Sequence, residues 1–224
     1  MKGTKALNKL IDHTLLKPTA TTADILTLCD EAKTHQFKSV CIEPVHVVTA
    51  KQALQGSEVL VCTVIGFPLG TNTTSTKVAE TKQALLDGAH EFDMVIHVGD
   101  ALEGRFERIE EDIRAVVQAA QGHTVKVILE TCYLSSDQIV QACHAAANAG
   151  AHFVKTSTGF GTGGATVEHV QLMNASIPAT MDVKASGGIR SHADAVAMVE
   201  AGASRLGTSS GVAIVQGQEG TSTY

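Results

Sequence analysis

Short runs of apolar and β-branched residues alternate along the chain with longer segments in which apolar positions recur every three or four residues. The short runs predict β-strands, and the longer segments predict amphipathic helices. Eight runs have this character. The strands that they predict are Ile11–Leu15, Ser39–Ile42, Val59–Ile65, Phe92–Ile96, Val125–Leu129, Phe153–Lys155, Ala179–Val183 and Arg205–Gly207.

The ends of the helical segments carry signals of their own. Three segments open with a hydroxyl residue and an early Asp, which is typical of a helix N-terminus. These segments begin at Thr22, Ser136 and Ser191. Three segments end in a Gly-Ala pair, and a predicted strand follows each pair. Their glycines are Gly88, Gly150 and Gly202. The recurrence indicates one repeating β–α unit rather than a succession of different domains.

Eight β–α units with apolar strands predict parallel strands that helices cover on the outside. We therefore expect a closed (β/α)8 TIM barrel that forms a single domain over residues 1–224. An open, doubly wound α/β sheet is the alternative with the same pattern of elements. The polar, glycine-containing tail, about residues 216–224, is expected to be mobile.

Composition narrows the classes of function. The chain has 224 residues, of which 44% are hydrophobic, and its formal net charge is −6. This balance gives no electrostatic reason to bind nucleic acid or an anionic membrane. The first residues lack the apolar stretch of a signal peptide, and no apolar run approaches the roughly 20 residues of a membrane span, so we expect a cytoplasmic protein. The odd count of five cysteines, without a Cys-x-x-Cys pair, favours free thiols.

Two lysines stand out because of where the predicted strands place them. Lys155 ends the sixth predicted strand, and Lys184 directly follows the seventh. Catalytic groups of such barrels gather at the C-terminal ends of the strands. Neighbouring ammonium groups repel each other, and burial also disfavours their charge, so both effects favour a neutral, nucleophilic amine. The alternative is that each lysine caps a helix or pairs with a surface carboxylate.

Other polar residues near strand ends allow two interpretations each. Asp93 is either a general acid/base or the ion-pair partner of a lysine. The same two roles are open to Asp12, and for Asp12 the ion-pair role is favoured. Cys41 has no base near it in sequence, so we expect a packed thiol. His13, His97 and His192 show no metal-binding spacing, and we expect hydrogen-bonded structural residues rather than metal ligands.

Glycines follow the last two predicted strands. Gly187 and Gly188 come after the seventh strand, and Gly207, Ser209 and Ser210 come at or after the eighth. The loops after these strands often bind phosphate in TIM barrels, because exposed backbone N–H groups attract anions. A phosphorylated substrate is therefore predicted, unless the glycines only shape tight turns.

The segment Gly159–Gly164 matches the dinucleotide pattern Gly-x-Gly-x-x-Gly, with Asp182 about 20 residues further on. We discount this match because the segment lies late in a run of similar units, and because Lys155 and three hydroxyl residues separate it from the strand core. A flexible active-site loop explains the glycines better.

Several segments together resemble deoxyribose-phosphate aldolases, over about residues 11–215 and in unbroken order. The segments Val154–Gly161, Val183–Arg190 and Arg205–Gly211 carry the most specific similarity, and Ile11–Pro18, Val64–Gly70 and Glu91–Ile96 add to it. The resemblance implies a class I aldolase that needs no cofactor and no metal ion. Such an enzyme reversibly cleaves 2-deoxy-D-ribose 5-phosphate to D-glyceraldehyde 3-phosphate and acetaldehyde in deoxynucleoside catabolism. It also implies a homodimer or homotetramer.

The resemblance assigns roles to residues of this chain. Lys155 is the Schiff-base nucleophile, Lys184 is the neighbouring cation that favours the neutral amine, and Asp93 is the acid/base partner. The phosphate-binding role falls to Gly187, Gly188, Gly207, Ser209 and Ser210. Thr156 and Thr158 follow Lys155 directly enough to offer relay hydroxyls or substrate contacts.

Three positions depart from the family pattern near the expected mouth of the barrel. Glu43 stands where the family usually has Asn, and we expect its side chain to point outwards. His97 and Asp100 replace an Asn and an uncharged residue. These departures bear on substrate preference and leave the lysine chemistry intact. One rival function, another phosphate-binding isomerase or Schiff-base lyase, would use the same phosphate loops, and the Lys155–Lys184 pair is the discriminator. Nothing in the sequence supports a second rival, a catalytically silent ligand-binding barrel, because the acid and both lysines are present.

Overall fold

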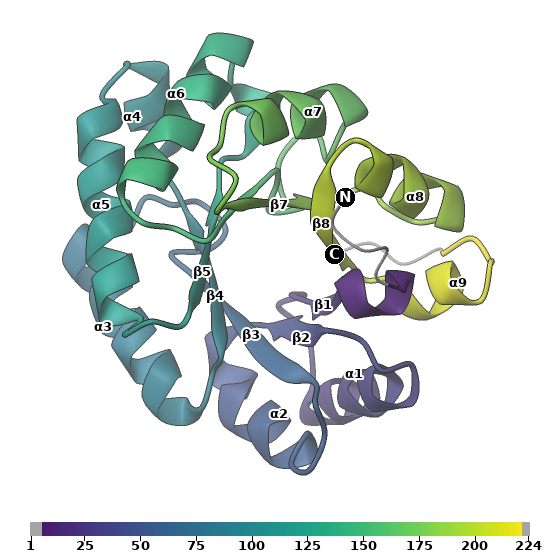
Figure 1. Cartoon of the computed structure of the whole chain (residues 1–224). Helices are drawn as coiled ribbons and strands as arrows, with labels where there is room; N and C mark the ends of the chain where they lie inside the picture. The colour runs from purple at the N-terminus through teal and green to yellow at the C-terminus, as the bar shows by residue number, and fades with distance from the viewer. Residues whose placement is uncertain (1–5, 221–224) are drawn as a thin grey trace.

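The computed structural model describes residues 6–220 and contains a closed barrel of eight parallel strands in sequence order (Figure 1). The ring closes where β1 pairs with β8, with Asp12 opposite Gly207. The strands are β1 (Ile11–Leu15), β2 (Ser39–Ile42), β3 (Leu60–Ile65), β4 (Glu91–Val95), β5 (Thr124–Ile128), β6 (Phe153–Lys155), β7 (Asp182–Ser186) and β8 (Ala203–Thr208). The predicted TIM barrel is confirmed, and the open sheet is excluded.

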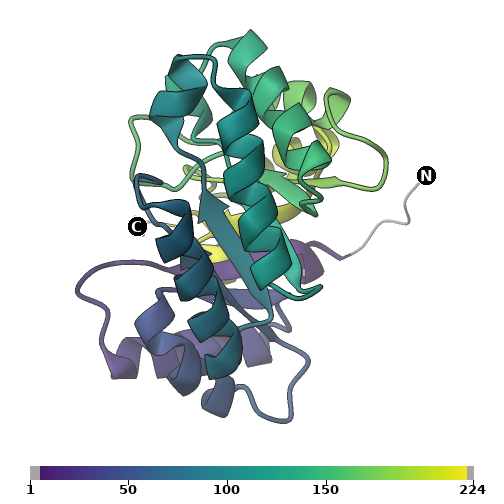
Figure 2. The same ribbon diagram turned by 90° about the vertical axis from the view of Figure 1, so that its left-hand side faces the viewer.

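Helices surround the barrel on its outside, and three of them, α3, α5 and α6, lie side by side in Figure 2. The α-helices are α1 (Thr22–Thr34), α2 (Val47–Ala53), α3 (Thr74–Asp87), α4 (Val98–Leu102), α5 (Phe106–Ala119), α6 (Ser136–Asn148), α7 (Val167–Ala175), α8 (His192–Glu200) and α9 (Gly211–Val215). Short 3-10 turns are η1 (Leu7–Leu10), η2 (Pro44–His46) and η3 (Thr131–Tyr133). Among the described residues, no helix combines the length and apolar character that crossing a bilayer requires.

The predicted strand bounds hold within two residues except in the seventh strand. Ala179–Val183 was predicted, whereas β7 is Asp182–Ser186. The N–H of Met181 donates to the carbonyl of Pro178 at 2.9 Å, so a turn occupies the first residues of the predicted strand. The apolar residues before Val183 suggested an early start. The strand instead continues through Lys184, because the inner face of this barrel is polar.

Helix starts follow the predicted pattern with a shift of one residue at most. Capping boxes occur at Thr21, Ser135 and Ser191, where the hydroxyl accepts from the third helical N–H and that residue's side chain accepts in return. Gly88 ends α3 with φ of 105°, a left-handed conformation that glycine adopts without strain.

The main apolar core is a layer between the sheet and the helices rather than the centre of the barrel. Outward-facing strand residues such as Phe92, Val127, Val154 and Leu206 are completely buried in this layer. The inner face carries charged side chains that are equally buried, including Asp12, Asp93, Lys126 and Lys184. The alternation of the strands therefore separates packing from chemistry.

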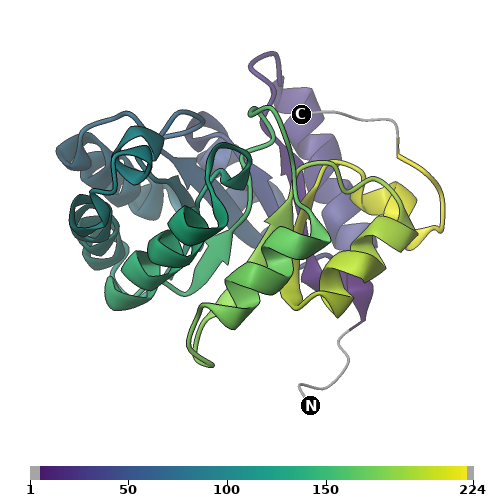
Figure 3. The ribbon, with the colours of Figure 1, turned by 90° about the horizontal axis from the view of Figure 1, so that it is seen from above.

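The loops that follow the strands share one end of the barrel, where Figure 3 shows the loops after β1 and after β6. After α9 in sequence, the N–H of Gly220 donates to the carbonyl of Arg190 at 2.9 Å. Residues 221–224, including Tyr224, lie outside the described residues. Mobility of the tail stays a prediction.

Candidate active site

Asp93, on the inner face of β4, is the point at which three lysines meet. Its Oδ2 lies 2.8 Å from Lys155 Nζ and 2.7 Å from Lys184 Nζ, and its Oδ1 lies 2.7 Å from Lys126 Nζ. Burial alone would raise the pKa of Asp93, but the three ammonium groups outweigh it and hold the pKa well below its usual range. The carboxylate is therefore fixed as an anion between the two lysines that the sequence singled out.

Lys184 lies within the strand β7 rather than beyond its end. Its Nζ contacts Asp12 Oδ2 at 2.6 Å in addition to Asp93. Burial alone would lower the pKa of Lys184, but Asp12 and Asp93 raise it above its usual value. The expectation that both lysines favour the neutral form is therefore wrong for Lys184. It ignored the carboxylates, which face Lys184 across the barrel.

Lys126 on β5 belongs to the same cluster, and sequence reasoning missed it. Its Nζ contacts Glu91 Oε2 at 2.7 Å as well as Asp93, and the side chain is completely buried. Burial alone would lower the pKa of Lys126, but Asp93 and its neighbours raise it well above the usual value. The available signal was a lysine between two valines in a strand, which is an unusual place for a charge.

Arg205 on β8, the register partner of Lys184, completes the cluster. Its guanidinium donates to Asp12 at 2.8 Å and to Glu91 at 2.7 Å, and it lies over the ring of Phe153. Asp12, for which the structural role was favoured, thus bridges Lys184 and Arg205. Burial would raise the pKa of Asp12, but Arg205, Lys184 and Lys126 lower it below its usual range.

The cluster contains one more cation than anions. Its cations are Lys126, Lys155, Lys184 and Arg205, and its anions are Asp12, Glu91 and Asp93. Charges in the cluster balance when one lysine is neutral. Lys155 contacts a single carboxylate, whereas Lys126 and Lys184 each contact more than one. Lys155 therefore has the fewest carboxylate partners of the three lysines.

Thr156 and Thr158 hold the loop that follows Lys155. The hydroxyl of Thr156 donates to the carbonyl of Ser186 at 3.0 Å and accepts from the Ser186 N–H, which ties β6 to β7. The hydroxyl and the N–H of Thr158 both donate to the carboxylate of Glu130. Burial raises the pKa of Glu130 despite these hydrogen bonds. Both hydroxyls are thus engaged with protein groups.

The glycine-rich loops that follow Lys155 and Lys184 in sequence form a cavity of about 250 Å³. Gly187, Gly188 and Ser209 line it together with Arg190, as does most of the segment Gly159–Gly164. Gly164 must be glycine, since a Cβ there would lie 2.3 Å from the carbonyl oxygen of Gly187. Gly187 and Gly188 have positive φ of 86° and 81°. The segment Gly159–Gly164 therefore belongs to this pocket, and none of its residues is part of α7, which begins at Val167.

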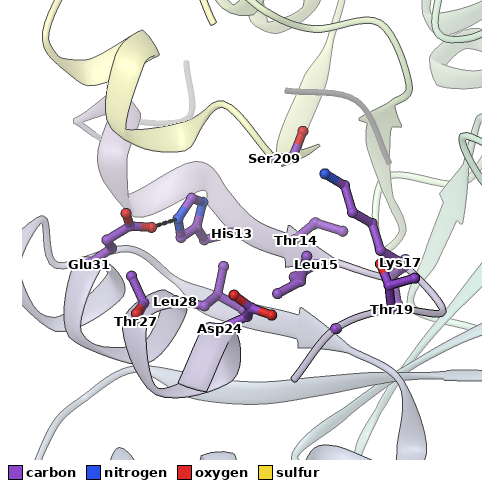
Figure 4. Close-up of a pocket in the computed structure, with 12 residues that line it drawn as sticks. His13, Thr14, Leu15, Lys17, Thr19, Asp24, Thr27, Leu28, Glu31 and Ser209 are labelled. Atoms are coloured by element: carbon purple, nitrogen blue, oxygen red, sulfur yellow. Dashed lines mark hydrogen bonds and ion pairs between the residues drawn. The ribbon is translucent and has the colours of Figure 1, made fainter. Parts of the chain in front are cut away.

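Gly207 and Ser210 do not line this cavity. A Cβ on Gly207 would lie 2.9 Å from Lys184 Cε, so the glycine leaves room for that lysine. Ser210 lines a neighbouring hollow with Gln218. Ser209 also borders a larger cavity of about 390 Å³, where Figure 4 shows it on the same side as Lys17.

An ion-paired histidine also lines the larger cavity. His13 Nε2 lies 2.6 Å from the carboxylate of Glu31, as the dashed line in Figure 4 marks. His13 is buried, which agrees with the expected structural role. His97 likewise caps α4 by accepting from the N–H of Asp100, whose carboxylate binds Arg105.

Cys41 lies on β2 near the mouth of the barrel, and Glu43 lies just after this strand. Glu43, expected to point outwards, is half-buried, and burial and the nearby carboxylate of Glu80 raise its pKa to about 7. The strand alternation that turns Cys41 inwards also applies to Glu43, two residues later. Cys41 Sγ lies 4.0 Å from Asp93 Oδ2 in a fully buried position.

Comparison with known proteins agrees with this geometry. The family described as DeoC/LacD family aldolase matches residues 7–217. Deoxyribose-phosphate aldolase of Staphylococcus epidermidis is 56% identical over 216 residues, covering 96% of this chain and 98% of the relative. That of Carboxydothermus hydrogenoformans is 57% identical over 221 residues, covering 97% of each.

A solved structure gives the same result in three dimensions. The deoxyribose phosphate aldolase from Aeropyrum pernix, described as tetrameric, superposes with a TM-score of 0.88 at 38% identity, covering 94% of this chain and 89% of that one. Sequence and fold thus agree, and the chain belongs to the DeoC/LacD family of aldolases.

Proposed function

We propose that this enzyme is a deoxyribose-phosphate aldolase that reversibly cleaves 2-deoxy-D-ribose 5-phosphate to D-glyceraldehyde 3-phosphate and acetaldehyde. Its role would be in deoxynucleoside catabolism. The observation that carries the proposal is a buried lysine, Lys155, that shares the Asp93 carboxylate with Lys184, together with a glycine-lined cavity formed by the loops that follow these two lysines. The curated relatives with 56–57% identity are named for the same activity.

In the proposed mechanism the neutral amine of Lys155 adds to the aldehyde carbon of the open-chain sugar. Loss of water then gives a protonated imine. The imine accepts the electron pair of the C2–C3 bond as a base removes the proton of the C3 hydroxyl. Glyceraldehyde 3-phosphate leaves, and an enamine of acetaldehyde stays on Lys155. Protonation of its carbon and hydrolysis release acetaldehyde and restore the amine.

Asp93 and Lys184 are the groups that we propose to move protons. Asp93 Oδ2 lies 2.8 Å from Lys155 Nζ and 2.7 Å from Lys184 Nζ, so a proton can pass along the Lys184–Asp93 pair without a large movement. The second carboxylate of Lys184, Asp12, keeps its ammonium in place. A water molecule between Asp93 and the C3 hydroxyl would complete the relay.

The substrate phosphate is proposed to bind in the cavity of about 250 Å³. Gly187, Gly188 and Ser209 line it, and Arg190 supplies a cation. Gly207 and Ser210, also predicted as phosphate contacts, lie outside that cavity, and Thr156 and Thr158 are engaged with protein groups. We therefore propose supporting roles for these four residues. No step of this chemistry requires a cofactor or a metal ion.

Borohydride trapping tests the proposal. The enzyme is incubated with acetaldehyde and sodium borohydride, and the modified lysine is located by mass spectrometry. We expect one ethyl group on Lys155 and none on Lys126 or Lys184. An adduct elsewhere, or activity that a chelator removes, would contradict the mechanism.

Replacement of the nucleophile is the first prediction. Lys155→Ala is expected to lower the rate of aldol cleavage by about 10⁴-fold or more, because the covalent path is lost. Circular dichroism should show an intact fold, since Lys155 contributes a single ion pair. Measurable cleavage at a rate near that of the wild type would overturn its role.

A cytoplasmic location and a homo-oligomeric state are further proposals. The five cysteines are free, as suits a reducing compartment. Large apolar side chains are exposed at Val45, Leu69 and Leu86, and a second copy of the chain could cover them. Sedimentation analysis would test the assembly.

A further inference from the structure

Two thiols on the inner face of the barrel take no part in the proposed mechanism. Cys41 on β2 and Cys62 on β3 are register partners in adjacent parallel strands, and both are completely buried. Both face the catalytic carboxylate. Cys62 Sγ lies 3.2 Å from Asp93 Oδ1, and Cys41 Sγ lies 4.0 Å from Asp93 Oδ2.

The three side chains lie close enough together to share a metal ion. The two sulfur atoms and one oxygen of Asp93 all lie within 4.8 Å of one another. In a tetrahedral zinc site the ligand atoms are about 3.4–3.8 Å apart, from bonds of about 2.3 Å to sulfur and 2.0 Å to oxygen. Side-chain shifts on the order of 1 Å would therefore bring this set around one ion. Two thiolates and a carboxylate suit soft or borderline cations such as Zn²⁺ and Cd²⁺.

The surrounding charges permit such an ion. Binding follows the balance M²⁺ plus two thiols to a dithiolate complex plus two protons, so the net charge of the cluster does not change. Lys126 Nζ already lies 3.2 Å from Cys62 Sγ and would stabilise a thiolate there. The protons leave to solvent, and neither sulfur is oxidised.

We propose that Cys41, Cys62 and Asp93 form an inhibitory site for a soft divalent metal ion. The bound ion holds the Asp93 carboxylate on the β2–β3 side and draws it from Lys155 and Lys184. The inhibitory part rests on the proposed catalytic role of Asp93, whereas metal binding by the two thiols does not.

Access to the site predicts slow inhibition. The thiols pack against Leu16, Val64 and the partly exposed Phe67, which must move before an ion can enter from the mouth. Inhibition by Zn²⁺ should therefore develop over time rather than on mixing, and substrate in the barrel should delay it.

A spectroscopic titration tests binding apart from catalysis. Co²⁺ added to the wild-type enzyme is expected to give a sulfur-to-cobalt charge-transfer band that saturates at one equivalent. The band should vanish in Cys62→Ala and in Cys41→Ala. It should persist in Cys143→Ala and Cys132→Ala, whose thiols lie elsewhere. A band that survives in both inner-thiol variants, or no band in the wild type, overturns the proposal.

An activity assay tests inhibition. Incubation of the wild type with Zn²⁺ is expected to lower the cleavage rate at least about tenfold, and a chelator should restore it. Cys62→Ala, checked for folding by its melting curve, should keep its own rate in Zn²⁺, while Cys143→Ala should be inhibited like the wild type. Wild-type binding without inhibition would overturn the inhibitory role of the site and would also count against Asp93 as the proton-moving group. Failure of Lys155 trapping would instead count against the proposed function alone.

Discussion

The two faces of the barrel sheet are equally buried, but the outer face is apolar and the inner face is charged. Lys126 and Val127 are consecutive residues of β5, and both have no solvent exposure. Val127 packs in the apolar layer beneath the helices, whereas Lys126 joins a cluster of seven charged groups. Apolar burial stabilises the fold, while burying charges gives little net stability even when they are paired. The outer face thus supports an inner face that is arranged for chemistry.

Replacing each of these two neighbours is the strongest test of that difference. Lys126→Met leaves Glu91 and Asp93 without one cation and is expected to cost about 3 kcal/mol of unfolding free energy. It also frees Asp93 to shift, and a shift of about 1 Å can lower catalysis by about 10²-fold. Denaturant unfolding and steady-state kinetics measure both effects.

Val127→Ala is the matched control on the outer face. It removes buried methyl groups and should cost about 2 kcal/mol, with little change of activity per folded molecule. If the two variants lost activity equally, the division between the two faces would be wrong.

Gly207→Ala adds one methyl group to the inner face and is expected to have a smaller effect than Lys126→Met. The added methyl would lie 2.9 Å from Lys184 Cε and from Ser186 Cβ, so Lys184 must shift and its contacts with Asp12 and Asp93 are disturbed. We expect a fall in kcat of about tenfold or more, with a smaller effect on KM. A rise in KM for the phosphorylated substrate with unchanged kcat would instead make Gly207 a phosphate contact, as the family resemblance implied.

Glu43 tests the boundary between the inner face and solvent. Burial and Glu80 raise its pKa to about 7, whereas an unfolded chain has a glutamate pKa of about 4.3. The protonated form is thus favoured in the fold, and its stabilising contribution is present below about pH 4 and lost as the pH rises through 7. Glu43→Gln should equal the wild type at pH 4 and exceed it by about 1 kcal/mol at pH 8, after allowance for solvent screening. Melting curves across this range measure the difference, and a constant difference would contradict it.

The smallest effect is expected on the outside of the barrel. Ser191→Ala removes the capping box of α8 and should cost about 1 kcal/mol. Activity at temperatures well below melting should not change, which thermal denaturation and kinetics at 25 °C can establish together. Loss of activity without loss of stability would show that α8 affects the adjoining phosphate cavity.

The outer face was the part that the sequence predicts well. Apolar periodicity places the strands because residues such as Phe92 and Val154 must pack under helices. The same reasoning misplaced β7, since Lys184 and Ser186 break the apolar pattern on the inside of the barrel.

The charged cluster was predictable only in part. Lys155 and Lys184 stood out through their neighbours in sequence and through family resemblance. Lys126, Glu91 and Arg205 lie in strands that are far apart in sequence, and only closure of the barrel shows which of them pair. The pKa of Lys184 depends on the same pairings. Sequence reasoning therefore predicted a lowered pKa, whereas the carboxylates raise it.

Pairing of the first strand with the last also governs how the enzyme is made. Asp12 emerges early from the ribosome, but its close partners Lys184 and Arg205 follow 172 and 193 residues later. At a synthesis rate of about 5–20 residues per second, about 10–40 s pass between the synthesis of Asp12 and that of its cationic partners. The inner face of a nascent chain therefore stays hydrated until β8 has been synthesised. A pause late in translation would lengthen the time during which an open, incomplete sheet is exposed to other chains.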